Sequence, residues 1–345
     1  MDIKGLLNYA VDHKASDLHL SSGLSPIVRI DGVLQHVENE EVLQEETLLK
    51  MLEDVLPEKR FEELKKHFEI DLSLSLPEIS SRFRVNIFHQ LRGISAVFRV
   101  IPEKILTLED LGVPAIFSKL AQLPHGLVLM TGPTGCGKST TLAAMIDYIN
   151  KTKKCHIITI EDPIEFVYKS DLSLIQQREV HQHTDNFEDA LRAVLREDPD
   201  VILVGEMRDL ETIRLALTAA ETGHLVFATL HTSSAPKTIN RIIDVFPAGE
   251  KDLVRTMLSE SLQAVVSQIL IQKIGGGRVA AQEVMICNSA IRNLIRENKS
   301  PQIASVIQTS KAQGMQTLEK HLVDLVENKT IDLETVKVLF PDVGE

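Results

Sequence analysis

The chain has 345 residues, a length that as a rough guide accommodates about two domains. Hydrophobic residues make up 43% and charged residues 25% of the sequence, a balance that supports a buried core and excludes a disordered chain. The formal net charge of −12 disfavours a general nucleic-acid-binding protein, because such proteins usually carry a basic stripe.

The sequence favours a cytoplasmic protein without a transmembrane segment. No apolar run approaches the roughly 20 residues that a membrane-spanning helix needs. The first 14 residues lack the long apolar core and the cleavage site of a signal peptide, and they predict an amphipathic helix. The three cysteines, Cys136, Cys155 and Cys287, follow neither metal-ligand nor disulfide spacing, so we expect reduced thiols.

Residues 1–100 predict one small α+β domain. We expect a first helix at Ile3 to His13 and two polar-faced helices, at Glu45 to Leu56 and Pro57 to His67. Asp31-Gly32 predicts a tight turn between two short strands. Three further strands are expected between residues 70 and 101, where apolar and polar side chains alternate.

Residues 101–114 are interpreted as a linker, since prolines stand near both ends and the segment has no strong period. Residues 115–345 predict an α/β domain, because apolar strands alternate with amphipathic helices, as in a parallel sheet covered by helices. The expected strands are Gly126 to Thr131, His156 to Glu161, Val201 to Glu206 and Leu225 to Leu230.

The remaining segments of this domain predict helices and one hairpin. Amphipathic helices are expected at Asn186 to Glu197 and at Leu210 to Thr222. The stretch from Glu250 to Leu270 predicts one longer helix, and Gly275 to Gly277 predict the turn of a hairpin. From Ser289 onward we expect several short helices.

Residues 132–140, GPTGCGKST, fit the pattern G-x-x-x-x-G-K-[ST] of a phosphate-binding loop. Glycines let the backbone turn so that several N–H groups point at a phosphate chain, and the following helix N-terminus favours anions. Lys138 would place positive charge on the outer phosphates, and the Ser139 hydroxyl can ligate Mg²⁺. The expected nucleotide-binding residues are Gly132, Pro133, Thr134, Gly135, Cys136, Gly137, Lys138, Ser139 and Thr140.

Acidic residues follow two of the predicted strands. Glu206 ends VILVGE, at the carboxyl end of a strand, where a second acidic residue commonly approaches the Mg²⁺ shell. The segment ITIEDPIEF supplies Glu161, Asp162 and Glu165. A carboxylate there could orient or deprotonate the attacking water, with Glu165 as our first choice and Glu161 as the second. A solvated acidic turn is the alternative.

Two histidines and three arginines are further candidates. His224 and His231 flank a predicted buried strand, and either could sense the γ-phosphate or be structural. Arg82, Arg84 and Arg99 lie in strands of the first domain, where alternation predicts that all three project from the polar face. They are surface charges or, if that domain folds over a nucleotide, one of them stabilises charge on the transferring phosphoryl group.

These motifs resemble those of the bacterial secretion ATPases. The Walker A box is residues 132–140, the aspartate-rich box is residues 160–166, the Walker B box ends at Glu206, and the histidine box is residues 222–232. AIRNLIRE, residues 290–297, is similar to a hallmark of the branch that retracts type IV pili. The resemblance begins at SDLHLSSG near the N-terminus and covers nearly the whole chain.

The resemblance implies a PAS-like N-terminal domain, a RecA-like P-loop motor domain and ATP bound between them. It implies a ring-shaped homohexamer that uses ATP and Mg²⁺, with Glu165 as the catalytic glutamate. Such a motor would dock peripherally at the inner membrane, on the pilus platform protein, and would return pilin subunits to the membrane. A related accessory retraction ATPase is a further partner to consider. Cys136 is the one departure in these boxes, because close relatives often carry serine there.

Other functions remain as alternatives. A pilus-extension or type II secretion ATPase usually has a longer N-terminal region and often a four-cysteine zinc insert, and this sequence has neither. A nucleotide-switched scaffold without turnover would be expected to lack acids at Glu165 and Glu206, and the acidic net charge disfavours a DNA translocase. Without the resemblance, AIRNLIRE would be read as a surface helix with Ile291, Leu294 and Ile295 on one side.

Overall fold

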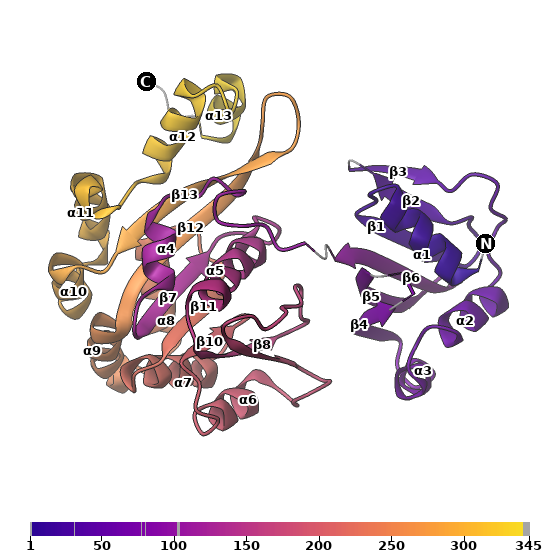
Figure 1. Ribbon diagram of the computed structural model, residues 1–345, viewed down its shortest axis with the longest axis horizontal. Helices are drawn as coiled ribbons and strands as arrows, with labels where there is room; N and C mark the ends of the chain where they lie inside the picture. The colour runs from indigo at the N-terminus through magenta and orange to yellow at the C-terminus, as the bar shows by residue number, and fades with distance from the viewer. Residues whose placement is uncertain (1, 31, 77, 80, 102–103, 341–345) are drawn as a thin grey trace. The chain divides into compact units, whose positions relative to one another are not determined.

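The computed structural model describes residues 2–30, 32–76, 78–79, 81–101 and 104–340. The chain divides into two units, one of Met1–Lys104 with Glu165–Val167 and one of Ile105–Ile164 with Tyr168–Glu345. Each unit contains a sheet of its own (Figure 1). The predicted turn at Asp31-Gly32 and the predicted linker both include residues outside the described ranges, namely Asp31 and residues 102–103.

The N-terminal unit contains a six-stranded antiparallel sheet in the order β3-β2-β1-β6-β5-β4. The predicted helices are confirmed, although α2 and α3 both end earlier than expected, α2 just ahead of Pro57, as is common before a proline. The elements are α1 (Ile3–Asp12), β1 (Asp17–Ser21), β2 (Ile27–Ile30), β3 (Val33–His36), α2 (Glu45–Glu53), α3 (Glu58–Leu64), β4 (Glu69–Leu76), β5 (Ser81–Gln90) and β6 (Gly93–Ile101).

The C-terminal unit contains a seven-stranded mixed sheet in the order β13-β12-β7-β11-β10-β8-β9. All strands except β13 run parallel to their neighbours. The four predicted strands are confirmed, and β9 is one that the sequence analysis did not identify. The strands are β7 (Gly126–Thr131), β8 (His156–Glu161), β9 (Leu174–Glu179), β10 (Val201–Val204), β11 (Leu225–Leu230), β12 (Leu262–Gln272) and β13 (Arg278–Ile286).

Helices cover both faces of this sheet (Figure 1). The sheet separates two hydrophobic cores, one on each face. Side chains alternate between them along β7, where Leu127 and Leu129 belong to the first core and Val128 and Met130 to the second. Helices α4 and α5 pack on the second core, and α6 to α11 contribute to the first. The helices are α4 (Ile116–Ala121), α5 (Lys138–Thr152), α6 (Phe187–Val194), α7 (Leu210–Glu221), α8 (Ala235–Asp244), α9 (Lys251–Ser261), α10 (Ser289–Arg296), α11 (Ile303–Thr309), α12 (Leu318–Glu327) and α13 (Leu333–Leu339).

The prediction of one helix from Glu250 to Leu270 is wrong. Helix α9 ends at Ser261, and β12 starts at the next residue, Leu262, with no glycine or proline between them. Strand β12 pairs in parallel with β7 and antiparallel with β13, and the predicted hairpin around Gly275 to Gly277 joins it to β13. Strand pairing with distant partners therefore overrides the helical spacing of the apolar residues.

The segment AIRNLIRE lies in and around α10, and its apolar stripe is part of the core. Ile291 and Ile295 are buried, and Leu294 packs against the same cluster from a partly buried position. The Asn288 side chain begins the helix by accepting a hydrogen bond from the Ile291 N–H. The sequence left open whether this stripe is core or a contact that relays motion, and the structure places its side chains in the core beside α9.

Arg292 of α10 binds the C-terminal end of α9. Its Nη1 donates to the main-chain oxygens of Ser259 and Glu260, the latter at 2.7 Å. Carbonyls at a helix C-terminus lack partners within the helix, and the helix dipole favours positive charge there. Arg296 reaches the same end through the Glu260 carboxylate at 3.4 Å. The two arginines thus join α10 to the junction between α9 and β12.

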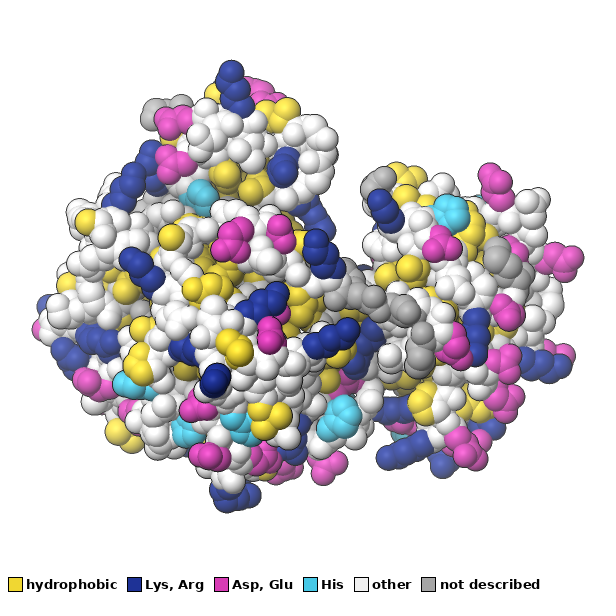
Figure 2. Space-filling model, in the orientation of Figure 1, with side chains coloured by type: hydrophobic (Ala, Val, Ile, Leu, Met, Phe, Trp, Pro, Cys, Tyr) yellow, Lys and Arg dark blue, Asp and Glu magenta, His cyan; other side chains and the backbone are white. Residues whose placement is uncertain are grey.

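Charged side chains of both signs are interspersed over the face drawn in Figure 2. The net charge of −12 is therefore not gathered into one continuous field on that face. Within the described ranges, every helix falls short of the length and apolar character needed to cross a bilayer.

Replacing Arg292 with alanine is expected to destabilise the C-terminal unit. Loss of the two bonds to the end of α9 should cost about 1–2 kcal/mol, which corresponds to a Tm decrease of roughly 2–8 °C. Differential scanning calorimetry measures this decrease. Lys299→Ala is the control, because Lys299 is an exposed residue paired with Glu297 and should leave Tm unchanged. An unchanged Tm for Arg292→Ala would contradict the capping role.

Candidate functional site

Loops after four parallel strands meet at the carboxyl edge of the seven-stranded sheet. The phosphate loop follows β7, Asp162 follows β8, Glu206 follows β10 and His231 follows β11. Because β7, β11, β10 and β8 are successive neighbours and run in the same direction, these ends lie side by side. Ligands of open α/β sheets bind at this edge.

The phosphate loop joins β7 to the N-terminus of α5, a helix of 15 residues. Gly132, Gly135 and Gly137 have φ angles of 139°, 76° and 86°, a region that favours glycine. Gly132 also has no space for a side chain, because a Cβ there would collide with the main-chain oxygen of Gln268 in β12. This backbone at the N-terminus of a helix fits the binding of an anionic phosphate chain.

Lys138 is buried at the start of α5, and its ammonium group lies against the loop. Nζ donates to the main-chain oxygens of Gly132 at 2.8 Å and Pro133 at 3.0 Å. The neighbouring Cys136 thiol is also buried, and this burial raises its pKa although Lys138 acts in the opposite direction. The thiol therefore remains protonated at neutral pH, which agrees with its interpretation as a small loop residue.

Glu206 bonds to a histidine and an arginine at once. Oε1 lies 3.0 Å from His231 Nε2, and Oε2 pairs with Arg208 Nη2 at 2.8 Å. Burial by itself would raise the pKa of Glu206, but the hydrogen bond and positive charge of Arg208, with contributions from His231 and Lys138, lower it overall. Glu206 is therefore an ionised carboxylate at neutral pH. The effect of Lys138 on the pKa of Glu206 shows that Glu206 lies near the phosphate loop.

The backbone around Glu206 is tied to both neighbouring strands. The Gly205 N–H donates to the main-chain oxygen of Ile160 in β8 at 2.8 Å, and the Met207 N–H donates to that of Thr229 in β11 at 3.1 Å. The Thr229 hydroxyl in turn donates to the Gly205 carbonyl. These bonds hold Glu206 at a defined position before any ligand arrives, as a preorganised site requires.

The structure separates the two histidines proposed as γ-phosphate sensors. His231 lies at the carboxyl edge beside Glu206, whereas His224 precedes β11 at the amino edge, where Nδ1 bonds to the Ala219 carbonyl at 2.9 Å. The six residues of β11 between them span roughly 20 Å. Within this chain His224 therefore does not reach the phosphate loop, and the sensing hypothesis is kept for His231.

The three carboxylates after β8 have different surroundings. Glu161 is buried, and its Oε1 accepts from the Thr159 hydroxyl at 2.6 Å and from Gln177 Nε2 at 3.2 Å. Asp162 is exposed at the sheet edge. Glu165 is half-buried and lies in the loop between β8 and β9, where its catalytic role stays a prediction.

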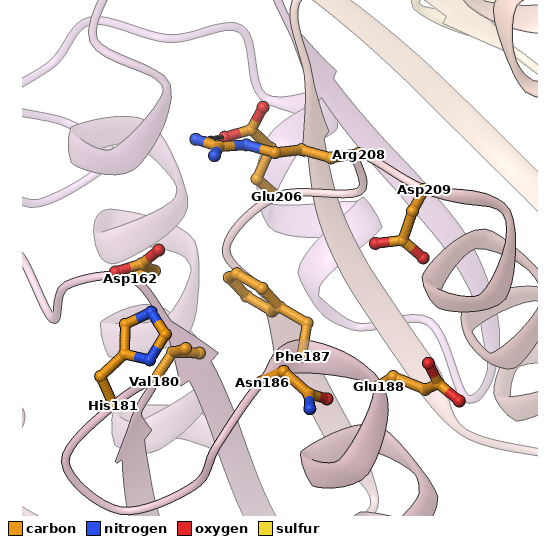
Figure 3. A pocket seen from close by; sticks show the side chains of 9 residues that line it. All are labelled: Asp162, Val180, His181, Asn186, Phe187, Glu188, Glu206, Arg208 and Asp209. Carbon is orange, nitrogen blue, oxygen red and sulfur yellow. Dashed lines mark ion pairs between the residues drawn. The ribbon is translucent and has the colours of Figure 1, made fainter.

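A cavity of about 240 Å³ opens beside Glu206. Figure 3 shows Phe187 among the side chains that line it, between the Glu206–Arg208 pair on one side and Asp162 and His181 on another. Sequence analysis did not identify Arg208. A signal for it was present, because MRD places an arginine two residues after Glu206, and alternate side chains of an extended segment share one side.

The three arginines of the N-terminal unit lie on strands whose buried side chains face the other way. Arg84 stands directly opposite Arg99 in the antiparallel pair of β5 and β6. Acidic side chains offset this like-charge pair, since Arg84 bonds to Asp71 at 2.7 Å and Arg99 bonds to Asp17 at 2.9 Å. Arg82 donates to a serine hydroxyl of β4 at 2.7 Å. Their action on a phosphoryl group stays a prediction.

Comparison with known proteins gives the family. Residues 1–337 match the sequence profile described as type II/IV secretion system protein. The chain belongs to this family. It is 58% identical over 337 residues to the type IV pilus retraction ATPase PilT of Pseudomonas aeruginosa, covering 98% of this chain and 97% of that protein. It is 57% identical over 314 residues to the twitching motility protein of Neisseria gonorrhoeae, covering 91% and 83%.

The similarity to solved structures also extends through the whole chain. A crystal structure of the pilus retraction motor PilT with bound ADP superposes with a TM-score of 0.92 at 48% identity, covering 99% of this chain and 98% of that one. The fold of an antiparallel-sheet unit followed by a mixed-sheet ATPase unit is thus the PilT-like fold. The chain is an ATPase of the secretion ATPase family.

Proposed function

We propose that this protein is an ATP-hydrolysing motor that drives type IV pilus retraction and, through it, twitching motility. The observation that carries the proposal is the 58% identity to PilT over 98% of the chain, a span that includes the phosphate loop, Glu206 and α10. A pilus-extension or type II secretion ATPase remains the second candidate within the family. The retraction role is favoured because both similar relatives named above act in pilus retraction or twitching by their descriptions.

The residues of the phosphate loop fit a nucleoside triphosphate. The site gathers positive charge from three sources. The loop N–H groups, in a backbone that depends on glycine, and the N-terminus of α5 carry partial charges, and the Lys138 ammonium carries a full charge. Lys138 and the loop N–H groups bind the β- and γ-phosphates of ATP. The ligand of the motor is therefore ATP, with residues 132–140 as its phosphate-binding segment.

Ser139 and Glu206 would hold Mg²⁺. Among the described residues, no group of three or more His, Cys, Asp or Glu side chains is arranged to hold a metal ion by itself. That fits Mg²⁺ in a nucleotide site, which uses one or two protein groups together with phosphate oxygens and water. A hydroxyl and the ionised Glu206 supply suitable oxygen donors, and the ion would neutralise charge on the phosphates.

Glu165 positions or activates the attacking water, with Glu161 as the alternative. One of Arg82, Arg84 and Arg99 completes the charge around the phosphoryl group when the two domains close. His231 Nε2 lies 3.0 Å from Glu206 Oε1. His231 therefore senses whether the γ-phosphate is present, next to the carboxylate that would hold the metal ion.

The proposed domain motion follows from a difference in affinity for ATP between the closed and open arrangements of the two domains. We take residues 1–100 as the PAS-like domain, 101–114 as the linker and 115–345 as the RecA-like domain. If the closed arrangement of these domains binds ATP more tightly than the open one, hydrolysis shifts the equilibrium between them. In the proposed assembly six chains form a ring in the cytoplasm at the inner membrane. The ring acts on the pilus platform protein, alongside a related accessory retraction ATPase.

Lys138→Ala is expected to lower ATP hydrolysis by about 10²–10³-fold, because it removes the main positive charge from the phosphate site. Phosphate release by the purified protein measures this loss, and twitching of a strain with the native gene deleted measures the biological effect. Lys151→Ala is the matched control, since Lys151 is an exposed lysine on the same helix. Normal hydrolysis by Lys138→Ala would contradict the ATP site. An active wild-type enzyme that does not restore twitching would contradict the retraction role.

Glu165→Gln and Glu161→Gln decide between the two candidates for water activation. Loss of the general base is expected to lower kcat by about 10²–10⁴-fold while leaving ATP affinity within about twofold of wild type. We expect this pattern for Glu165→Gln. Glu161 is held by Thr159 and Gln177 in the sheet edge, so its replacement should mainly affect stability. The reverse result would transfer the catalytic role to Glu161.

A further inference from the structure

A buried glutamine of β12 contacts the phosphate loop at two points. The Gln268 side chain is 2% exposed, and its Nε2 donates to the main-chain oxygen of Cys136 at 2.7 Å. Its own main-chain oxygen occupies the place that a side chain on Gly132 would need. One residue from the neighbouring strand therefore contacts both the beginning and the end of the loop.

The bond to Cys136 fixes the direction of a backbone N–H group. The Cys136 carbonyl and the Gly137 N–H belong to one planar peptide unit, and in a trans peptide these two groups point in opposite directions. While Gln268 holds the carbonyl toward β12, the Gly137 N–H points away from β12. Gly137 tolerates this arrangement because its φ of 86° is accessible to glycine.

Two donors fix the Gln268 side chain in turn. Its Oε1 accepts from the Thr141 hydroxyl of α5 at 3.0 Å and from Gln282 Nε2 of β13 at 2.8 Å. Since both donors require an acceptor, the amide cannot rotate to present oxygen to Cys136 without losing both bonds. Gln282 is itself 1% exposed, so the network is shielded from water.

The network continues to the C-terminal helices. The Gln282 N–H donates to His321 Nδ1 of α12 at 3.0 Å, and the Gln282 carbonyl accepts from Gln316 Nε2 at 3.0 Å. Burial lowers the pKa of His321, so the ring is neutral at pH 7 and Nδ1 can accept. These bonds hold the strand position from which Gln282 reaches Gln268.

We propose that Gln268 is a positioning residue of the ATPase, which holds the Cys136–Gly137 peptide group so that the Gly137 N–H faces the phosphates of the nucleotide. This inference rests on the proposed function, since it requires phosphates to bind in the loop. Gln268 acts through the loop backbone and does not touch the reacting atoms. Its loss should therefore weaken nucleotide binding more than it slows the chemical step.

Gln268→Glu tests the proposal because it preserves size and the acceptor oxygen while removing the donor to Cys136. At pH 8 an ionised Glu would place a carboxylate oxygen against the main-chain oxygen of Cys136, and the two would repel. The Kd of the full chain for a fluorescent ADP analogue is expected to rise about threefold to tenfold, the effect of one buried hydrogen bond. At pH 6 the buried carboxyl, whose pKa burial raises, would be protonated and could donate again. Affinity relative to wild type should then recover.

Gln272→Glu makes the same charge change at an exposed position of the same strand and should leave the Kd unchanged. Calorimetry on each variant separates lost stability from lost affinity. A wild-type Kd for Gln268→Glu at both pH values, with only Tm lowered, would overturn the positioning role. If that variant does not fold, Gln268→Met removes the donor without adding charge and should raise the Kd at both pH values, and an unchanged Kd would again overturn it.

The same assay separates this inference from the proposed function on which it rests. Wild-type protein should bind the ADP analogue, and Lys138→Ala should bind it more weakly. If the wild-type protein does not bind the analogue at all, the nucleotide site itself is refuted. If the wild-type protein binds the analogue, Lys138→Ala weakens binding and the Gln268 variants leave the Kd unchanged, the ATPase assignment stands and the positioning role is refuted.

Discussion

The close packing of the phosphate loop against β12 is the constraint on which the site depends. Gly132 leaves no space between the loop and the β12 backbone, and Gln268 bonds to the other end of the loop. The loop therefore has one available path from β7 into α5, and that path places Lys138 at the carboxyl edge of the sheet. Glu206 and His231 reach the same edge because β11 pairs in parallel with β7, and β10 pairs in parallel with β11.

The charges at this edge stabilise one another before a nucleotide binds. Glu206 remains ionised although partly buried, because it is paired with Arg208 and the charge of Lys138 also lowers its pKa. An incoming triphosphate adds negative charge, and it would compete with Glu206 for Arg208 and Lys138. In the proposed motor, nucleotide binding would change the contacts of Glu206 with Arg208 and His231, which follow β10 and β11.

Local patterns predicted much of this protein, and long-range pairing explains what they missed. The alternation of Phe83, Val85 and Ile87 and the glycine spacing of the phosphate loop are local, so the sequence was sufficient to identify them. Strand β12 was predicted as helix because its apolar residues have helical spacing. The pairing with β7 and β13 that makes it a strand cannot be read from its own residues. That error also hid Gln268, although a glutamine in an apolar run was a signal. The predicted strand between His224 and His231 already implied that they lie at opposite edges of the sheet, and the structure shows that only His231 lies at the edge of the phosphate loop.

A structure of the full chain with Mg²⁺ and a non-hydrolysable ATP analogue would test whether the phosphate loop, held against β12, binds the nucleotide. We predict phosphate oxygens within hydrogen-bonding distance of the Gly137 N–H and Lys138 Nζ, and the metal ion beside the Ser139 hydroxyl. We also predict that the bond from Gln268 to the Cys136 carbonyl is retained. Phosphates bound away from residues 132–140, or a loop released from β12 in the bound state, would contradict these predictions.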